Sequence, residues 1–488
     1  MLIRSRSEFE AMRLAIATFI TITEIIFLYF MSSAGIEYVL SSLVLSLAVL
    51  LQLCFGIRKD AAVPADIVAF IFSWLFLDLS PKIQLLSSPR MLVNTSSVVA
   101  SGVLITNLIC AVFIVVFTAV YALAHRPLAA EAAVDQPDLE PQEAETFTPF
   151  GICLLLGICV VVVAILGRTP YQADSTVLAP ITPSTLVVKK FLLFMPSAAL
   201  LIYLNGLIQA RRKWVFSSLC VLGVLILLVA FTENPLTEKR NALGPVYLGL
   251  ILVAFRSRLQ GLNARLFLLV ASMVLIFPAV TVMTHSHHQF LHGVQLSAVV
   301  ETLKDHYFSV NYDAWANTYT IVEMVGKQGI GWGRQLLGDF LFFVPSSVWH
   351  TKPLATGIAI GNYLIMHHSG WFTNLSAPLP AEGYVDFGTL GAALYGALLA
   401  MFVEWLNRLA ADDSRTIAFP LAAYAALYLM FALRGSLMVA FAYGAGSLLA
   451  FLVAAGCLSI GGRRIGQRYF RIEDDSPPPD QQVSGLLK

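Results

Sequence analysis

The chain has 488 residues, of which 58% are hydrophobic and only 12% are charged, and its mean hydropathy is +0.76. This composition excludes a disordered chain and an ordinary soluble enzyme, and it indicates a protein with many membrane-spanning segments. The net charge of +1 gives no electrostatic basis for binding nucleic acid. Because the six cysteines all fall inside apolar runs, neither a disulfide framework nor a zinc site is predicted.

Apolar stretches long enough to cross a bilayer recur along the whole sequence. A spanning helix needs about 17 to 25 apolar residues. Such stretches lie near residues 11–31, 35–56, 64–80, 98–124, 149–167, 188–209, 214–232, 242–256, 265–284, 385–405, 416–433 and 436–460. We therefore predict an all-α, polytopic integral membrane helix bundle of about 12 transmembrane helices, with a helical periplasmic loop domain.

Basic residues set the orientation, because short cytoplasmic loops carry an excess of Lys and Arg. In a twelve-span arrangement they fall on alternate loops, at Arg4, Arg6 and Arg13, Arg58 and Lys59, Arg211, Arg212 and Lys213, Arg256, Arg258 and Arg265, and Arg408 and Arg415. The C-terminal segment adds Arg463, Arg464, Arg468 and Arg471. Both termini are therefore predicted to be cytoplasmic.

The spans and the stretches between them divide the chain into six parts. Polar, acidic, proline-bearing segments cannot bury a core, so the linker and the tail are predicted to be disordered. The parts are 1–124 with transmembrane helices 1–4, the acidic linker 125–148, 149–284 with helices 5–9, the periplasmic loop domain 285–384, 385–460 with helices 10–12, and the tail 461–488.

The loop domain is the one long polar region between spans, and loops of that length are usually functional or disordered. Its many Trp, Tyr, Phe and His residues favour a folded domain. In "YDAWANTYTIVEMV", Tyr312, Trp315, Tyr319 and Val322 share one face of a helix, which is predicted to lie on the membrane or to cap the bundle. "GIGWG" then breaks the chain before a second helix, "RQLLGDFLFF", and "FFVPSSVWHTKP" turns it twice.

These stretches carry a resemblance to a known family. "NYDAWANTYTIVEMV", "GWGRQLLGDFLFFVPSSVWHTKP" and "PAEGYVDFGTLGAALYG" together resemble the large-loop signature of the Wzy-type O-antigen and repeat-unit polymerases. The last element has Glu382, Gly383, Tyr384, Gly388 and Gly391, with Glu-Gly where the family has Gly-Glu or Ala-Glu. The resemblance covers 311–395, together with "TEKRNALG" at 237–244.

The resemblance implies an integral-membrane glycosyltransferase of the GT-C type that needs no metal and no cofactor. Such an enzyme transfers a glycan from one undecaprenyl-diphosphate carrier to the repeat unit on another, producing O-antigen or exopolysaccharide. It implies a multi-pass protein of the bacterial inner membrane whose active site faces the periplasm. Expected partners are the lipid-linked donor and acceptor, membrane lipids, a chain-length regulator (polysaccharide co-polymerase) and a flippase.

The departing diphosphate needs cations, and the planar fork of arginine binds phosphate oxygens in pairs. The candidates near the outer face are Arg240, Arg334, Arg434, Lys239, Lys352 and Arg168. Arg240 is singled out by both hydropathy and the resemblance. The alternative is that these side chains are interfacial anchors, which extend along apolar surface to the lipid headgroups.

The acceptor hydroxyl needs a positioned base, for which Glu382, Asp386, His350 and Asp313 are the candidates. Asp386 has a rival role as a helix N-cap, and His350 as a plain surface residue. Glu24 lies in the middle of the first span, where a carboxylate must be protonated or paired with a buried donor.

Aromatic side chains in the loop domain are predicted to stack on sugar rings, because they offer flat contact areas with a polar tip. The candidates are Tyr312, Trp315, Trp332, Trp349 and Tyr384, and a domain core or an interfacial belt is the alternative for some of them. "HSHHQFLH" places His288 and His292 four residues apart, but no Cys and no His-Glu-x-x-His pattern joins them, so no metal site is predicted.

Other functions remain open at this stage. An O-antigen ligase of the same superfamily transfers the same glycan to lipid A core. A transporter or flippase of polysaccharide or lipid-linked sugar fits the number of spans, and a non-catalytic exporter subunit is a further alternative. Sugar identity, linkage and the choice of base are not fixed by the sequence.

Overall fold

In the computed structural model, the secondary structure of the described part of the chain is all helical, without β-strands. It comprises residues 2–32, 35–87, 92–95, 97–124, 147–168, 183–209, 215–234, 240–259, 262–273, 310–368, 370, 372–412 and 415–460. Its helices are α1 (Leu2–Met31), α2 (Ile36–Phe55), α3 (Ala65–Ile71), the π-helix η1 (Phe72–Leu79), α4 (Ser80–Ser87), α5 (Ala100–Leu123), α7 (Pro149–Arg168), α8 (Pro183–Gln209), α9 (Phe216–Thr232), α10 (Arg240–Ala254), α11 (Leu262–Ala271), the 3₁₀ turn η3 (Val310–Tyr312), α15 (Ala314–Gln328), α16 (Arg334–Phe340), α17 (Thr356–His367), α18 (Leu379–Ala411), α19 (Ala418–Arg434) and α20 (Leu437–Ser459).

Six described helices are long and apolar enough to cross a membrane: Glu10–Met31 of α1, α2, α5, Thr185–Gln209 of α8, α18 and α20. They match the predicted spans at 11–31, 35–56, 98–124, 188–209, 385–405 and 436–460. Four more predicted spans form apolar helices of 10–17 residues, at Pro149–Ile165, Phe216–Thr232, Ala242–Ala254 and Ala418–Arg434. The span expected at 265–284 lies partly outside the described residues, so a helical membrane bundle is supported, but the full twelve spans are not.

The weakest predicted span, 64–80, is where the structure departs most from a simple spanning helix. There α3, η1 and α4 follow one another without a break, and the π-helix in the middle interrupts the regular α-helical hydrogen bonding. Asp66, Asp78 and Lys82 in this segment are all buried. The polar residues that lower its hydropathy therefore face the protein interior.

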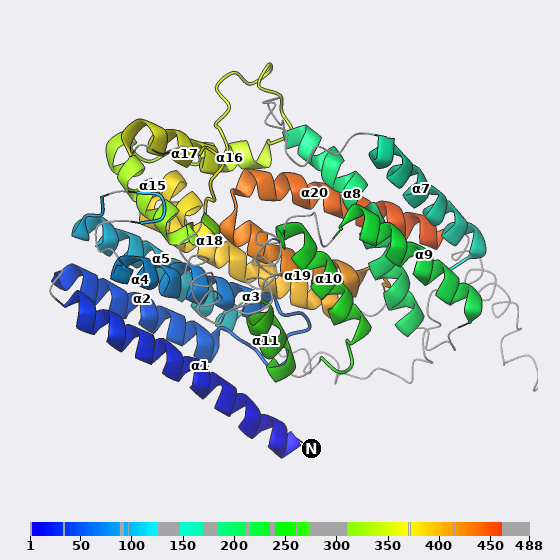
Figure 1. The fold of residues 1–488 in the computed structure, drawn as a ribbon, viewed down its shortest axis with the longest axis horizontal. Helices are drawn as coiled ribbons and strands as arrows, with labels where there is room; N and C mark the ends of the chain where they lie inside the picture. Colours follow the sequence, from blue (N-terminus) through cyan, green and yellow to red (C-terminus); the bar gives the residue numbers. More distant parts are fainter. Residues whose placement is uncertain are drawn as a thin grey trace, which may run out of the picture.

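The long helices run in broadly similar directions, with α1 and α2 along one edge and α7, α8 and α9 along the other (Figure 1). The most extensive packing is between α8 and α20, between α5 and α18, and between α2 and α5. Two glycines permit this closeness: a Cβ at Gly396 would lie 2.6 Å from the Phe113 carbonyl oxygen, and one at Gly446 would lie 2.5 Å from that of Val187. Small residues at such crossings are typical of membrane helix packing.

The loop-domain helices gather at the end of the bundle where α18 and α20 begin (Figure 1). α15 packs against α5, α18 and η1, and its side chains Trp315 and Tyr319 belong to the main hydrophobic core. α17 covers the outer side of α15 and forms with it a smaller second core around Ile321, Ile360 and Tyr363. The loop domain is thus embedded in the bundle through α15, and α17 lies on the outer side of α15.

Candidate functional site

Helix α15 is inserted into the bundle and does not lie on its surface. All residues from Ala314 to Val322 are buried. Trp315 donates from its indole nitrogen to Asn107 Oδ1 at 2.8 Å, and Tyr312 stacks on Phe76 with ring centroids 5.0 Å apart. The rings of Tyr312 and Trp315 therefore pack inside the protein and have no exposed face on which a sugar ring could stack. The predicted sugar-binding role of these two residues is not supported by this structure.

Asp313 and Arg434, predicted separately as base and phosphate ligand, lie together. Arg434 Nη2 is 3.3 Å from Asp313 Oδ1; the carboxylate is buried, whereas the arginine side chain is 31% exposed. Asp313 also accepts hydrogen bonds from Ser376 Oγ at 2.6 Å and from Asn317 Nδ2 at 2.9 Å. The carboxylate is thus fixed from three sides, and it holds the guanidinium at the edge of the bundle.

Helix α18 contains a sharp kink that shapes the rest of the site. Phe387 and Gly388 leave the helical conformation, and Gly388 has φ of 63°, which an L-residue with a side chain rarely adopts. The two helical segments close on each other, because a Cβ at Gly391 would lie 1.8 Å from the Gly383 carbonyl oxygen. The three glycines of the motif, Gly383, Gly388 and Gly391, thus mark a kink in α18. Glu382 and Asp386 lie on the short helical segment that precedes this kink.

Asp386 caps α16, not its own helix. Its Oδ1 accepts from Gln335 N at 3.0 Å, and its Oδ2 accepts from Leu336 N at 3.1 Å. Tyr395, beyond the kink, donates to the same Oδ2 at 2.7 Å. The predicted role in helix capping is present, but it acts across space on α16, since α18 begins earlier, at Leu379.

Glu382 is fully buried and is held by groups from two other elements. Thr356 Oγ1 donates to its Oε2, and the backbone N–H of Leu437 donates to its Oε1 at 3.0 Å. Leu437 follows Arg434 by three residues, across the turn between α19 and α20. That outer turn, residues 434–437, therefore contacts Asp313 through Arg434 and Glu382 through its backbone.

Asp339 completes a cluster of three buried carboxyl groups with Glu382 and Asp386. Gln335 Nε2 donates to Asp339 Oδ1 at 3.2 Å, while Asp339 Oδ2 has no hydrogen-bond partner among the described residues. Burial, together with the negative charges of Glu382 and Asp386, raises the pKa of Asp339 to about 9. Asp339 is therefore protonated at neutral pH.

This protonation predicts how stability depends on pH. An aspartic acid in the unfolded chain ionises near 3.8, so between that pH and about 9 the native state binds more protons than the unfolded state. Stability must then fall as pH rises across this window. We expect Asp339→Asn, which is neutral at every pH, to gain thermal stability relative to the wild type when the pH is raised from about 5 to about 8. Thermal unfolding in detergent measures it.

Asp412→Asn is the matched control, because that carboxylate is 38% exposed and paired with Arg415 at the surface. Its stability relative to the wild type should change little with pH. Parallel pH profiles for the wild type and Asp339→Asn would contradict the assignment of the proton to Asp339.

The loop between α16 and α17, residues 341–355, is tied down by two of the predicted phosphate ligands. Lys352 Nζ donates to the carbonyl oxygens of Phe342 at 2.7 Å and Val344 at 2.9 Å, and its partial burial lowers the pKa of its ammonium group. Arg334 is exposed and donates from Nη2 to Thr351 O at 2.7 Å. Both side chains thus brace the loop in this structure; Arg334 also remains open to solvent.

The other loop candidates differ in how open they are. Trp332 is 80% exposed and has φ of 51°, an uncommon conformation for a residue with a side chain. The backbone on either side of it is clamped, since Gly331 N donates to Val385 O at 2.8 Å and Gly333 N to Asp386 O at 3.3 Å. Trp349 is half-buried with an indole that donates to Thr351 Oγ1, His350 is exposed, and Tyr384 packs half-buried between the two cores.

Part of the predicted site lies beyond what the structure describes. Lys239 lies outside the described residues, as do most of the linker 125–148, the first part of the loop domain up to 309 with its "HSHHQFLH" run, and the tail 461–488. Arg168 ends α7 and Arg240 begins α10, but their side chains are not described. Within the described part of the chain, no three His, Cys, Asp or Glu side chains are arranged to hold a metal ion.

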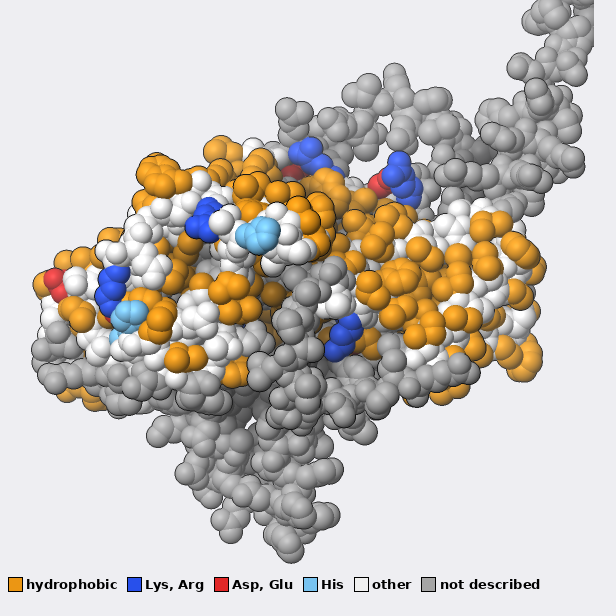
Figure 2. All heavy atoms as spheres, turned by 90° about the horizontal axis from the view of Figure 1, so that it is seen from above, with side chains coloured by type: hydrophobic (Ala, Val, Ile, Leu, Met, Phe, Trp, Pro, Cys, Tyr) orange, Lys and Arg blue, Asp and Glu red, His pale blue; other side chains and the backbone are white. Residues whose placement is uncertain are grey.

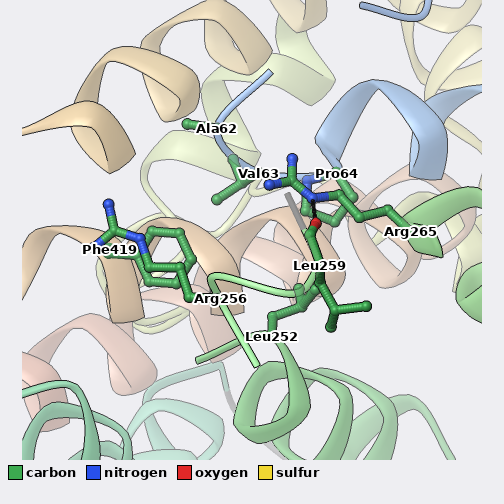
Figure 3. Close-up of a pocket in the computed structure, with 8 residues that line it drawn as sticks. All are labelled: Ala62, Val63, Pro64, Leu252, Arg256, Leu259, Arg265 and Phe419. Carbon is green, nitrogen blue, oxygen red and sulfur yellow. Dashed lines mark hydrogen bonds between the residues drawn. The ribbon is translucent and has the colours of Figure 1, made fainter. Parts of the chain in front are cut away.

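A cavity at the opposite end of α19 is unsuited to a substrate. It holds about one water molecule and is lined by Val63, Leu252, Arg256, Arg265 and Phe419 among others (Figure 3). The Arg256 guanidinium lies 4.1 Å from the centre of the Phe419 ring, and Arg265 donates to the carbonyl oxygens of Ala61 and Leu259. These arginines join α10, α11 and α19 to the loop before α3.

Four groups of the site were missed from the sequence: Asp339, Tyr395, Thr356 and the backbone N–H of Leu437. A signal for the first existed, because Gln335 and Asp339 are polar residues at i and i+4 and so lie on one face of their helix. The backbone N–H of Leu437 could not be predicted, because a backbone donor has no signature in the sequence.

The chain was also compared with known proteins. No family model, curated protein or solved structure matches it.

Proposed function

We propose that this protein is a membrane glycosyltransferase that polymerises undecaprenyl-diphosphate-linked oligosaccharide repeat units at the periplasmic face into O-antigen or exopolysaccharide. The observation that carries the proposal is the outer turn at 434–437. It joins a partly exposed arginine, fixed by Asp313, to a buried carboxyl cluster around Glu382, at one end of a bundle of apolar helices. The loop motifs that resemble the Wzy-type polymerases lie around this turn.

Each part has a role in glycosyl transfer. Arg434 binds the diphosphate of the departing carrier, and Asp313 positions its guanidinium. Glu382, with Asp339 beside it, accepts the proton of the attacking sugar hydroxyl, because a carboxyl group whose charge is disfavoured by burial is a stronger base than one in water. Trp332, the open aromatic side chain of the loop domain, binds a sugar ring. Arg240, Arg334 and Lys239 remain proposed as further phosphate ligands.

The proposed setting is the bacterial inner membrane, with twelve spans, both termini in the cytoplasm and the loop domain in the periplasm. Six long apolar helices, together with four shorter ones, support the membrane part of this proposal. A polyprenyl carrier has its diphosphate in the headgroup layer. A site at the end of the bundle can therefore bind the diphosphate while the polyprenyl tail stays in the membrane.

Purified protein in detergent or nanodiscs, supplied only with undecaprenyl-diphosphate-linked repeat units, tests the proposal. We expect a ladder of longer glycans that remain attached to lipid. Transfer only after lipid A core is added would instead identify an O-antigen ligase. An absence of turnover with both acceptors, combined with movement of the lipid-linked sugar between leaflets, would identify a transporter.

A further inference from the structure

After its exposed first residue, Arg334, helix α16 has polar residues on its inner side and apolar residues on its outer side. Gln335 and Asp339 are buried and hydrogen-bonded to each other, whereas Leu337 and Phe340 are 51% and 58% exposed. A helix on an aqueous surface has the reverse arrangement, because burying polar groups and exposing apolar ones both cost free energy. The outer face of α16 is therefore suited to a neighbour other than water.

The same exposure continues along the chain after α16. Phe343 is 59% exposed and Val348 is 74% exposed, and neither lies in a loose segment. Lys352 closes the loop on the carbonyl groups of Phe342 and Val344, as described above. Because the loop is braced, its apolar side chains are held outward, and an apolar surface of this kind marks an interaction site.

This surface is continuous with the outer surface of an apolar membrane-length helix. Phe340 packs on Phe441 of α20, with ring centroids 5.3 Å apart. Leu448 and Leu452, at i+7 and i+11 from Phe441, lie on the same side of α20 and are 44% and 53% exposed. The loop extends sideways from the bundle, and hydrophobic side chains surround a few charged ones on that side of the molecule (Figures 1 and 2).

We propose that residues 334–355 form an interfacial flap, which lies in the headgroup layer of the bilayer at this end of the bundle. Leu337, Phe340, Phe343 and Val348 contact the acyl chains. The exposed Ser346, Ser347 and His350 lie among the headgroups, and Trp349 lies at the boundary where indole rings are enriched. The continuity with α20 identifies the bilayer, and not a protein, as the occupant of this surface.

This inference concerns a lipid contact and holds whether or not the protein transfers sugars. It also explains why, past Arg334, α16 carries its polar side chains on the bundle side. One face of this short helix contacts lipid, and the other carries Asp339 into the cluster with Glu382 and Asp386.

Spin labels attached to single cysteines at positions 343 and 348 test the flap, in a cysteine-free background reconstituted into nanodiscs of phosphatidylethanolamine and phosphatidylglycerol. Oxygen partitions into the bilayer, whereas a nickel chelate stays in water. We expect oxygen to relax both labels more strongly than the nickel chelate does. A label at position 327 is the matched control, because Lys327 is 51% exposed on α15 in the same domain and should show the opposite order.

Labels at 343 and 348 that respond to the nickel chelate as strongly as the label at 327 would overturn the flap. Labels that neither reagent reaches would reveal a protein contact and overturn it as well. If the cysteine-free background does not fold, Trp349→Phe in the native chain gives the same information. The emission of Trp349 is the fluorescence of the wild type minus that of Trp349→Phe. We expect this emission to be quenched when the lipids carry bromine near the headgroup. Unquenched Trp349 emission would contradict the flap.

Discussion

Replacing Arg434 with alanine is expected to stop glycan chain growth, with a loss of at least about 10²- to 10³-fold in the rate of transfer. The Arg434 guanidinium is partly exposed at the end of the bundle, and Asp313 fixes its orientation, with Oδ1 lying 3.3 Å from Nη2. Charge that develops on a departing diphosphate is stabilised by a donor already in place, which costs no reorganisation during the reaction. Arg434→Lys should restore little, because a point charge cannot replace two parallel hydrogen bonds. Gel analysis of lipid-linked products measures both variants.

A second variant separates this chemical role from a structural one. Arg434→Ala alone leaves the buried Asp313 carboxylate without its cation, which lowers stability, although by less than the roughly 3–5 kcal/mol of a fully buried pair because Ser376 and Asn317 still donate to Asp313. Arg434→Ala combined with Asp313→Asn removes both charges, so it should recover thermal stability and remain inactive. Arg408→Ala is the control: that arginine is 55% exposed at the other end of α18, its partner Glu404 keeps its ion pair with Arg58, and the variant should retain full activity. Wild-type product lengths from the double variant would remove Arg434 from the diphosphate site.

Hydropathy predicted the long helices well because a bilayer-length apolar run is a strong and local signal. It predicted the shorter and broken ones less well. The stretch 64–80 contains Asp66 and Asp78, which lower its hydropathy, and the structure buries both against hydrogen-bonding partners: Arg58 N for Asp66, and Lys82 and Ser46 for Asp78. The predicted start of α18 at 385 is late for a related reason: the short segment before the kink is polar, yet it continues the same helical element from Leu379.

The candidate site was predicted as a set of residue types and not as an arrangement. Asp313 and Arg434 were singled out for different roles, and only the fold shows them 3.3 Å apart, because 121 positions separate them in the chain. Tyr312 and Trp315 show the opposite outcome. Aromatic residues on one face of a helix suit a sugar platform and a buried core equally, and packing against α5 and η1 decides for the core. Asp339 was missed because its partners Glu382 and Asp386 come from another helix.

Glu24 shows what could and could not be predicted about a charged residue within a membrane span. A carboxylate in the middle of a span was expected to be protonated or paired, and the structure pairs it: Lys82 Nζ lies 2.6 Å from Glu24 Oε2 and 2.6 Å from Asp78 Oδ1. Ser46 Oγ lies 2.9 Å from both Glu24 Oε2 and Asp78 Oδ1 and donates its one proton between them. The partners could not be found from the first span alone, because they lie on α2, η1 and α4.

This buried triad leads to the largest stability effect that we expect. Lys82→Met should destabilise the protein by roughly 3–5 kcal/mol, because it leaves two carboxylates close together without the ammonium group between them. Glu24 Oε1 and Asp78 Oδ2 already have no hydrogen-bond partner among the described residues, so the site has little capacity to absorb further negative charge. Thermal unfolding in detergent, and the yield of folded protein, measure the loss.

Two further variants distinguish electrostatics from packing at this position. Lys82→Met together with Glu24→Gln and Asp78→Asn removes every charge at nearly constant volume, and it should recover most of the lost stability. Lys327→Met is the matched control, since Lys327 forms an exposed pair with Glu323 at i and i+4 and should contribute little to stability. If the triple variant were as unstable as Lys82→Met, the lysine would act through its packed stem, and the buried ion pairs would not explain the stability of this region.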